Sequence, residues 1–433
     1  MGDTVNIFWF RRDLRLNDNH GLYKALSSGR AVLPLFIFDT AILDGLPATD
    51  RRVNFIYESI QQINALLKLK ARGLLVYYGN PEVVFKSLFS KYTVEAIYTN
   101  TDYEPYALQR DEQIKQIAFV HKAEFYSFKD HVIFEKDEVI KHDATPYKVF
   151  TPYSRSWKSR LSIEGIPYWP SEKLLENFIT DLPENIPTLT EMHFEPVNFH
   201  YPKIEIDTNL LTNYEKTRNF PAADATTHLG MHLRFGTLSI REAVKAGAEY
   251  SETWLNELIW REFFMHILFH YPRVIHQSFK PVYDRIAWRN NETEFELWKL
   301  GKTGYPLVDA GMRELVQTGF MHNRVRMVTA SFLTKHLLID WRWGESWFAL
   351  HLLDYELASN NGNWQWAAGT GCDAAPYFRI FNPLEQAAKF DSEEKYVKRW
   401  VPEIHTIDYP ASMVEHKMAR ERCLNTYKQA LKP

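Results

Sequence analysis

Three segments in the second half of the chain combine side chains that could do chemistry. In the first, residues 254–262, helical spacing places Glu257, Trp260 and Arg261 on one side of a helix. Aromatic rings supply stacking faces for flat ligands as well as core volume, so this group could hold a ligand. Taken alone, the segment favours an ordinary ion pair between Glu257 and Arg261, four residues apart, beside a core tryptophan.

The other two segments lie further along the chain. In residues 319–327, Asn323 and Met327 share a helix face, and two arginines bracket that face. In residues 354–366, the pattern predicts a helix that breaks at an amide-rich turn and delivers two tryptophans. Each segment by itself fits a solvated helix start or a common loop. The occurrence of all three in one chain favours a functional site.

A fourth segment, residues 226–236, places hydroxyls and a glycine just before predicted helices. Backbone N–H groups at such a helix start, with the Thr226 and Thr227 side chains, could hold a pyrophosphate. An ordinary helix N-cap explains these residues about equally well. His266 and His270 have zinc-ligand spacing, but no third ligand accompanies them, so we predict packed histidines and no metal site.

The first 130 residues alternate short apolar runs with amphipathic stretches. This alternation predicts a doubly wound, Rossmann-like parallel sheet with helices on its faces. No G-x-G-x-x-G pattern follows the first run, so the usual dinucleotide fingerprint is absent. The predicted strands are Val5–Phe10, Val32–Phe38, Leu74–Tyr78, Val94–Tyr98 and Glu124–Phe128, and the predicted helices are Asn54–Lys70 and Pro81–Phe89.

The remaining sequence changes character twice. Residues 131–201 are rich in proline and predict an ordered connector between a domain at 1–130 and a domain at 202–433. The last part is predicted to be entirely helical. Its predicted helices are Tyr214–Asn219, Ser239–Ala246, Glu252–His270, Tyr305–Gly319, Arg324–Leu338 and Trp343–Ala358.

Composition narrows the class of protein. A chain of 433 residues with 45% hydrophobic residues predicts two domains. Its two cysteines fit no metal or redox spacing, and no signal peptide or long apolar run is present, so we expect a cytoplasmic protein. The net charge of −3 does not suggest a nucleic-acid binder, although a local basic surface could still form.

Four stretches carry a resemblance to a known family. They are Phe8–Arg15, Leu233–Gly236, Asn360–Trp366 and Phe381–Pro383. With these, nearly the whole chain resembles the photolyase/cryptochrome superfamily, and specifically the class I cyclobutane pyrimidine dimer photolyases. The resemblance implies an N-terminal α/β domain with an accessory chromophore and a C-terminal helical domain that holds FAD. It also implies a deoxyribodipyrimidine photo-lyase, a carbon–carbon lyase that acts on UV-damaged DNA as a cytoplasmic monomer without an obligate protein partner.

The resemblance assigns a set of residues to the flavin. Asn360 would face flavin N5, where plant cryptochromes carry an acid, and a neutral amide tolerates a reduced, anionic flavin better than a carboxylate does. Arg326 and Asp354 would form a pair against the isoalloxazine ring, and Glu356 would face N3. The complete set is Tyr214, Thr226, Thr227, Leu229, Arg261, Arg326, Asp354, Glu356 and Asn360.

The same resemblance implies a pocket for a flipped-out pyrimidine dimer, since a dimer inside a duplex cannot reach a buried flavin. Trp260 and Trp366 would form its walls, and Glu257 would bond the thymine carbonyl or imide groups. Asn323 and Met327 complete the pocket. Enzymes for (6-4) lesions carry an additional histidine where this chain has Asn323-Arg324, which favours the cyclobutane substrate.

Two further groups follow from the resemblance. The first group matches basic positions at a DNA-facing rim, where its members would hold phosphates on either side of the lesion; it consists of Arg218, Arg261, Arg324 and Arg379. Trp288, Trp341 and Trp364 match a chain of tryptophans that passes electrons to the flavin. In the implied mechanism, excited reduced FAD donates an electron to the dimer, the ring opens and the electron returns.

Alternatives remain open at this point. A signalling photoreceptor could retain the same core, and a light-independent flavin or DNA-binding module is a third reading that the tryptophan series disfavours.

The antenna is undecided among a flavin-type pigment, a deazaflavin and a folate. Folate-using relatives have an Asn-Glu pair where Tyr106 and Ala107 stand here, and Gly230, Met231 and His232 depart from the usual phosphate-binding segment.

Overall fold

The computed structural model describes residues 4–183 and 186–432; Glu184 and Asn185 of the predicted connector lie outside this part of the chain. Two compact units interleave along the sequence. The first contains the chain up to Glu138, Ser159–Ile206 and His228–Ala246, and the second contains Val139–Lys158, Asp207–Thr227 and the chain from Gly247 onward. The contiguous boundaries 1–130, 131–201 and 202–433 stay a prediction.

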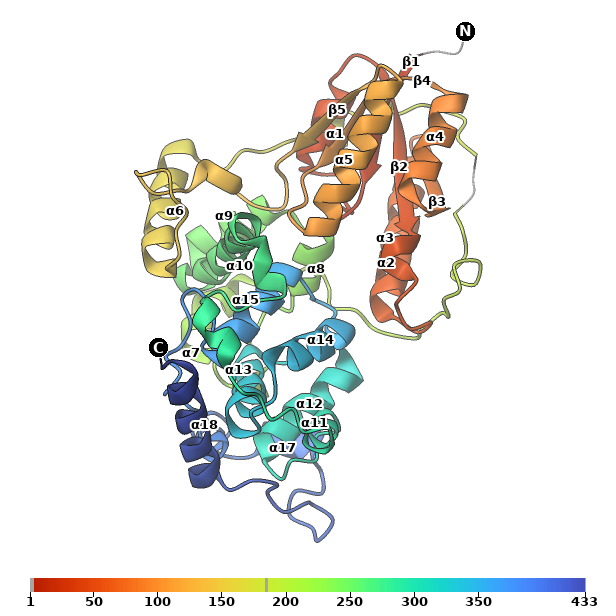
Figure 1. Cartoon of the computed structure of the whole chain (residues 1–433). Coiled ribbons are helices and arrows are strands. Elements are labelled where there is room, and N and C mark those ends of the chain that lie inside the picture. The colour runs from red at the N-terminus through yellow and green to blue at the C-terminus, as the bar shows by residue number, and fades with distance from the viewer. Residues whose placement is uncertain (1–3, 184–185, 433) are drawn as a thin grey trace. The chain divides into compact units, whose positions relative to one another are not determined.

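A five-stranded parallel sheet forms the centre of the first unit (Figure 1). Its strand order is β3-β2-β1-β4-β5, so the chain begins in the middle and winds outward in both directions. The doubly wound sheet predicted from the alternating pattern is therefore confirmed. The strands are β1 Thr4–Phe10, β2 Ala31–Asp39, β3 Leu75–Gly79, β4 Thr93–Asn100 and β5 Glu124–Phe128.

Helices connect the strands. In β1, Ile7 and Trp9 share one core cluster with Phe85 and Ile114, because alternate strand residues point to the same face. The sequence pattern missed four of these helices: α1, α2 and α8 are short, and α5 has an arginine, Arg110, among its buried positions. The helices are α1 His20–Leu26, α2 Thr40–Leu43, α3 Arg51–Lys68, α4 Pro81–Lys91, α5 Pro105–Val120, α8 Gly230–Phe235 and the start of α9 Ile240–Tyr250.

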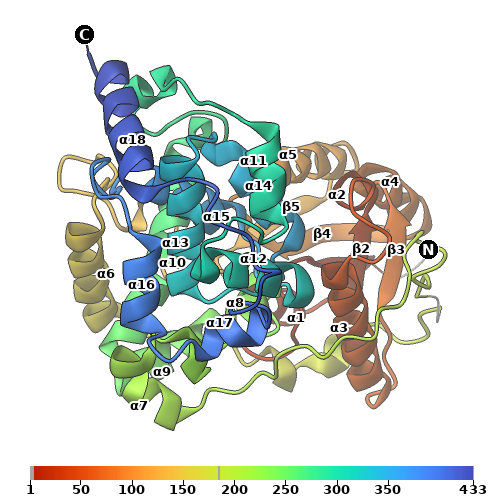
Figure 2. The same cartoon turned by 90° about the horizontal axis from the view of Figure 1, so that it is seen from below.

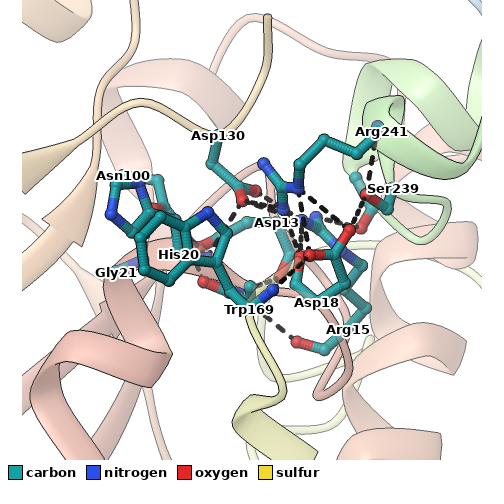
Figure 3. A network of polar contacts seen from close by, with 12 residues as sticks. Asp13, Arg15, Asp18, His20, Gly21, Asn100, Asp130, Trp169, Ser239 and Arg241 are labelled. Carbon is teal, nitrogen blue, oxygen red and sulfur yellow. Dashed lines mark hydrogen bonds and ion pairs between the residues drawn. The ribbon is translucent and has the colours of Figure 1, made fainter. Parts of the chain in front are cut away.

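A buried ionic network fastens distant segments of the first unit together (Figure 3). The Asp130 carboxylate accepts hydrogen bonds from Arg15 at 2.7 Å and from Arg241 at 2.8 Å, and Arg241 also pairs with Asp18 at 2.9 Å. Burial alone would raise the pKa of Asp130, but the two guanidiniums outweigh burial and hold that pKa below its usual range. The loop after β1, the segment after β5 and the start of α9 are thereby joined.

The second unit is helical, and Figure 2 shows α10, α13 and α15 close together in its middle. Its main core consists of apolar side chains from α12 to α15 and α17. None of the helices in the described residues is long and apolar enough to span a membrane. The helices are α6 Phe150–Glu164, which begins in this unit, α7 Thr208–Thr217, α10 Glu252–His270, α11 Glu292–Lys299, α12 Pro306–Thr318, α13 Asn323–Ser331, α14 Trp341–His351, α15 Leu357–Ala368, α16 Pro383–Phe390, α17 Lys395–Trp400 and α18 His416–Ala430.

Helix α10 has the predicted bounds, but the predicted helix Tyr214–Asn219 belongs to α7, which begins earlier, at Thr208, and ends at Thr217. Two further helix predictions and the connector also need correction. The predicted helix Arg324–Leu338 is α13 followed by one π-helical turn, Phe332–His336. The predicted helix Trp343–Ala358 is wrong, because the chain leaves α14 after His351 and begins α15 at Leu357. The predicted connector also contains a helix, α6.

The amide-rich segment lies inside α15 and is not the turn that its composition suggested. Gly362 is tolerated there because α15 packs tightly on α10: a Cβ at this position would come within 2.1 Å of the Phe264 ring. Gln365 is buried and donates to the Val274 carbonyl and to Asn361. Tertiary contacts therefore satisfy the polar side chains that made this segment look like a loop.

Candidate active site

A cavity of about 90 Å³, which is an open depression and not an enclosed hole, lies in the second unit. Helices α13, α14 and α15 and the turn that precedes α15 supply its lining, so two of the three segments singled out from the sequence meet here. The lining includes Asn323, Arg326, Met327, Asp354, Glu356, Asn360, Trp364 and Trp366.

An arginine–carboxylate pair stands at one side of this cavity. Arg326 Nη2 lies 2.9 Å from Asp354 Oδ2 and 3.2 Å from Oδ1, and Arg326 Nε donates to the Met321 carbonyl at 2.7 Å. The expected pair between Arg326 and Asp354 is thus present. Because Arg326 donates to both Asp354 and the Met321 carbonyl, the guanidinium plane has a defined orientation at the cavity.

Arg261 has a different partner from the one that its spacing suggested. Its Nε lies 3.1 Å from Glu356 Oε2, so the predicted i,i+4 pair with Glu257 is wrong. Helix α10 packs against α15, which brings Arg261 to the residue that precedes α15. Glu356 is 5% exposed, and a carboxylate this deeply buried needs such a cation.

Glu345 fixes the orientation of the Asn360 side chain. Asn360 Nδ2 donates to both the backbone carbonyl and Oε1 of Glu345, each at 3.0 Å, and burial raises the pKa of Glu345. With both amide hydrogens directed at α14, the amide carbonyl oxygen is left to accept a hydrogen bond on the cavity side. Sequence reasoning missed Glu345, since no local pattern relates it to Asn360.

The donor set fits a flavin ring. Such a ring has apolar faces and an edge of alternating N–H donors and carbonyl acceptors, and this cavity offers a guanidinium, two carboxylates, an amide oxygen and the Trp364 ring. The residues present therefore match the group that the resemblance implied.

The residues predicted near the ribityl and phosphate groups lie in two units. Tyr214, on α7, and Thr226 and Thr227, after it, are half-buried in the second unit, and burial raises the pKa of Tyr214 to about 12. Leu229 is buried in the first unit, where it precedes the six-residue helix α8.

The predicted lesion pocket is only partly contained in the cavity. Asn323, Met327 and Trp366 line it, whereas Glu257 and Trp260 project from α10 and are absent from its lining. Trp260 stacks on Phe150, with ring centroids 3.8 Å apart and an angle of 5° between the planes. Phe150 lies in the predicted connector, so the sequence offered no signal that it supports Trp260.

Three arginines of the second unit influence one another. Arg324 Nη2 donates to Asn219 Oδ1 at 2.6 Å, and the guanidinium lies over the Phe390 ring. Burial lowers the pKa of Arg324, and the positive charges of Arg218 and Arg379 lower it further. These residues, predicted to face DNA, thus form one cationic cluster, which is what an anionic ligand requires.

The three predicted electron-transfer tryptophans belong to one hydrophobic core. Trp364 and Trp341 are buried, and Trp288 is half-buried against the same core. Close packing requires Gly344 on α14, because a Cβ there would lie 2.1 Å from the Trp364 ring. An aromatic series from the cavity toward the surface is therefore compatible with the packing.

Comparisons with known proteins identify the family of this chain. A family described as "FAD binding domain of DNA photolyase" matches residues 254–408, and one described as "DNA photolyase" matches residues 6–172. The deoxyribodipyrimidine photo-lyase of Escherichia coli is 36% identical, over 99% of each chain. That of Synechococcus is 34% identical, over 98% of this chain and 96% of the relative.

Solved structures give the same result. A class III photolyase from Agrobacterium tumefaciens superposes with a TM-score of 0.87 at 33% identity, covering 100% of this chain and 99% of that one. A Sulfolobus tokodaii photolyase with two FAD molecules has a TM-score of 0.80 at 35% identity, covering 98% and 100%. The chain therefore belongs to the photolyase/cryptochrome family, with an FAD cofactor and light-driven DNA repair as its activity.

Proposed function

We propose that the protein is a deoxyribodipyrimidine photo-lyase that repairs cyclobutane pyrimidine dimers in UV-damaged DNA. The observation that carries this proposal is the arrangement within the second unit. A cavity with a flavin-compatible donor set opens beside Asn323, Met327 and Trp366, and a cluster of three arginines occurs in the same unit. The chemistry supplied by bound FAD, when light-excited and reduced, is reversible electron donation to the dimer.

In this proposal the chain's own residues bind and orient the cofactor. Arg326 and Asp354 hold one edge of the ring, Glu356 with its partner Arg261 holds another, and the Asn360 amide faces N5. Glu345 fixes the direction of that amide through two hydrogen bonds. Tyr214, Thr226, Thr227 and Leu229 are proposed for the ribityl and phosphate groups.

The lesion would leave the duplex and enter the depression beside Trp366. Two flat indoles, Trp260 and Trp366, would replace the stacking that the bases lose, and Asn323 and Met327 would complete the pocket. Phe150 backs one face of Trp260, so the opposite face is the one available to a ligand. Glu257 would hydrogen-bond to the flipped pyrimidines.

The arginines would hold the backbone on either side of the lesion. Arg218, Arg324 and Arg379 provide charge for phosphates, which fixes position without reading sequence. Trp364, Trp341 and Trp288 would pass electrons to the cofactor and so restore its active state. Membership of class I, a cytoplasmic location, a monomeric state and independence from protein partners stay predictions.

A second chromophore would have room in the first unit. An open cavity of about 860 Å³ there is lined by Phe55, Phe199 and Tyr201, by the cationic side chains of Lys70 and Lys203, and by the carboxyl groups of Glu58 and Glu172. Aromatic faces with adjacent positive charge suit a flat, anionic pigment of flavin, deazaflavin or folate type. A second pigment released from purified protein, and reduced in Tyr201→Ser without loss of FAD, would support this location; an unchanged pigment content would refute it.

The decisive experiment illuminates the reduced protein with an oligonucleotide that contains one thymine dimer. Repair should appear as light-dependent recovery of thymine, absent in the dark, and should fall at least tenfold in Glu257→Ala. Glu294→Gln, which removes a carboxylate from an ion pair elsewhere in the second unit, is the control and should repair normally. Bound FAD without repair of this dimer would refute the proposed substrate.

A further inference from the structure

An ion pair joins Glu257, which is proposed to bind the lesion, to Arg218, which is proposed to bind a DNA phosphate. Arg218, at the C-terminal end of α7, donates from Nη1 to Oε1 of Glu257 on α10. The two side chains are 26% and 33% exposed, so a ligand can reach the pair from solvent. The Arg218 guanidinium also lies over the Tyr214 ring, 5.6 Å from its centroid, which keeps it beside α10 when its partner changes.

Arg218 and Glu257 differ in the charges that surround them. On the side of Arg218, Arg324 and Arg379 add positive charge, so an arriving phosphate is attracted to the cluster. On the side of Glu257, the nearby Arg261 is committed to Glu356. Of the groups facing Glu257, α7 supplies Tyr214 and Arg218. Arg218 is the ion-pair partner that the described residues give Glu257.

A guanidinium binds carboxylate and phosphate with the same fork of N–H donors. While Arg218 is paired with Glu257, the two charges cancel and the arginine offers little to a phosphate. When a phosphate takes the arginine, Glu257 becomes a half-buried carboxylate that needs another donor. The imide N–H of a flipped-out pyrimidine is such a donor, whereas the same group in intact duplex DNA is already base-paired.

We propose that Glu257 and a DNA phosphate exchange places on Arg218 when damaged DNA binds, and that this exchange contributes to the preference for the lesion. In the free protein the ion pair is closed. On damaged DNA the phosphate takes Arg218 and the Glu257 carboxylate accepts a hydrogen bond from the pyrimidine imide. On undamaged DNA the carboxylate finds no new donor, so the exchange opposes binding. This inference rests on the proposed function.

The test is a double-mutant cycle of dark DNA binding. Wild type, Glu257→Gln, Arg218→Gln and the double variant are titrated with an undamaged duplex and with a duplex carrying one thymine dimer, at several salt concentrations. Glu257→Gln should bind undamaged DNA roughly fivefold more tightly, with a salt dependence steeper by about one phosphate contact, because Arg218 is released. Its preference for the dimer should fall roughly tenfold. In the Arg218→Gln background the Glu257 substitution should leave affinity for undamaged DNA unchanged.

Glu294→Gln is the matched control. Glu294 pairs with Arg289 at 2.8 Å in the same unit, with exposures of 23% and 31%, so the substitution makes the same change in net charge. A gain in undamaged-DNA affinity that is equal in Glu257→Gln and Glu294→Gln, or absent from both, would overturn the exchange. If Glu257→Gln loses its flavin, Glu257→Asp, whose shorter side chain withdraws from Arg218, should give the same gain. A wild-type protein without any preference for the dimer would instead overturn the proposed function.

Discussion

The two units use charged side chains in opposite ways. In the first, Arg15, Asp18, Asp130 and Arg241 are at most 5% exposed and satisfy one another (Figure 3). In the second, the arginine cluster is partly exposed, and Glu257, the carboxylate that pairs with it among the described residues, cancels only part of its positive charge. A closed network of this kind stabilises the fold, because each charged group has its ion-pair partner within the network. A partly exposed cluster with surplus charge is suited to a ligand that arrives from outside.

The largest expected effect tests the closed network. Asp130→Asn leaves two buried guanidiniums without their shared carboxylate, so the free energy of unfolding should fall by about 3–5 kcal/mol in denaturant titrations. In the wild type, the low pKa of Asp130 means that its contribution is present at neutral pH and is lost as the pH falls toward that pKa.

Glu95→Gln provides the control in the same unit. Glu95 and Arg30 form a pair at 2.7 Å in which both side chains are about half exposed, so its loss should change stability by less than about 1 kcal/mol. If both substitutions lowered the free energy of unfolding equally, burial would not make the Asp130 network more stabilising than an exposed pair, and the comparison would fail.

Glu314, a buried acid of the second unit, sharpens the comparison, because no arginine forms an ion pair with it among the described residues. Glu314 accepts a hydrogen bond from the Tyr396 hydroxyl at 2.5 Å, and burial raises its pKa to about 7. The folded protein therefore keeps a proton that the unfolded chain has released above pH 4.5. Stability contributed by Glu314 is present below pH 4.5 and is lost as the pH rises through about 7.

Glu314→Gln should remove this loss, since the amide does not titrate and its oxygen can still accept from Tyr396. The stability of the variant relative to wild type should rise between these two pH values by up to roughly 3 kcal/mol, measured by denaturant titration at each pH. A difference between the two proteins that is constant across this range would exclude a titrating Glu314.

The smallest expected effect on stability belongs to the arginine cluster. Arg324→Gln should change the free energy of unfolding by less than about 0.5 kcal/mol, because two neighbouring cations already oppose its charge. The same substitution should weaken DNA binding roughly tenfold and reduce the salt dependence by about one phosphate contact. Loss of folding together with binding would place Arg324 in the structural class of the Asp130 network.

Local pattern predicted much of this molecule. The five strands and helix α10 could be found from the sequence because alternation and helical spacing depend on residues only a few positions apart. The same spacing placed Asn323 and Met327 on one face, and both line the cavity. The resemblance to a family, carried by long runs of residues, added the cofactor and the activity.

Other features were decided only by tertiary packing. Spacing along α10 suggested that Glu257 pairs with Arg261. In the structure, Glu257 pairs with Arg218 and Arg261 pairs with Glu356, because helix packing brings these distant residues into contact. Composition suggested a turn near Gly362, yet close packing on Phe264 makes it helix. The sequence by itself determined which side chains are present and which helix face they occupy. The partner of each charge depends on distances between segments far apart in the chain, which no local pattern contains.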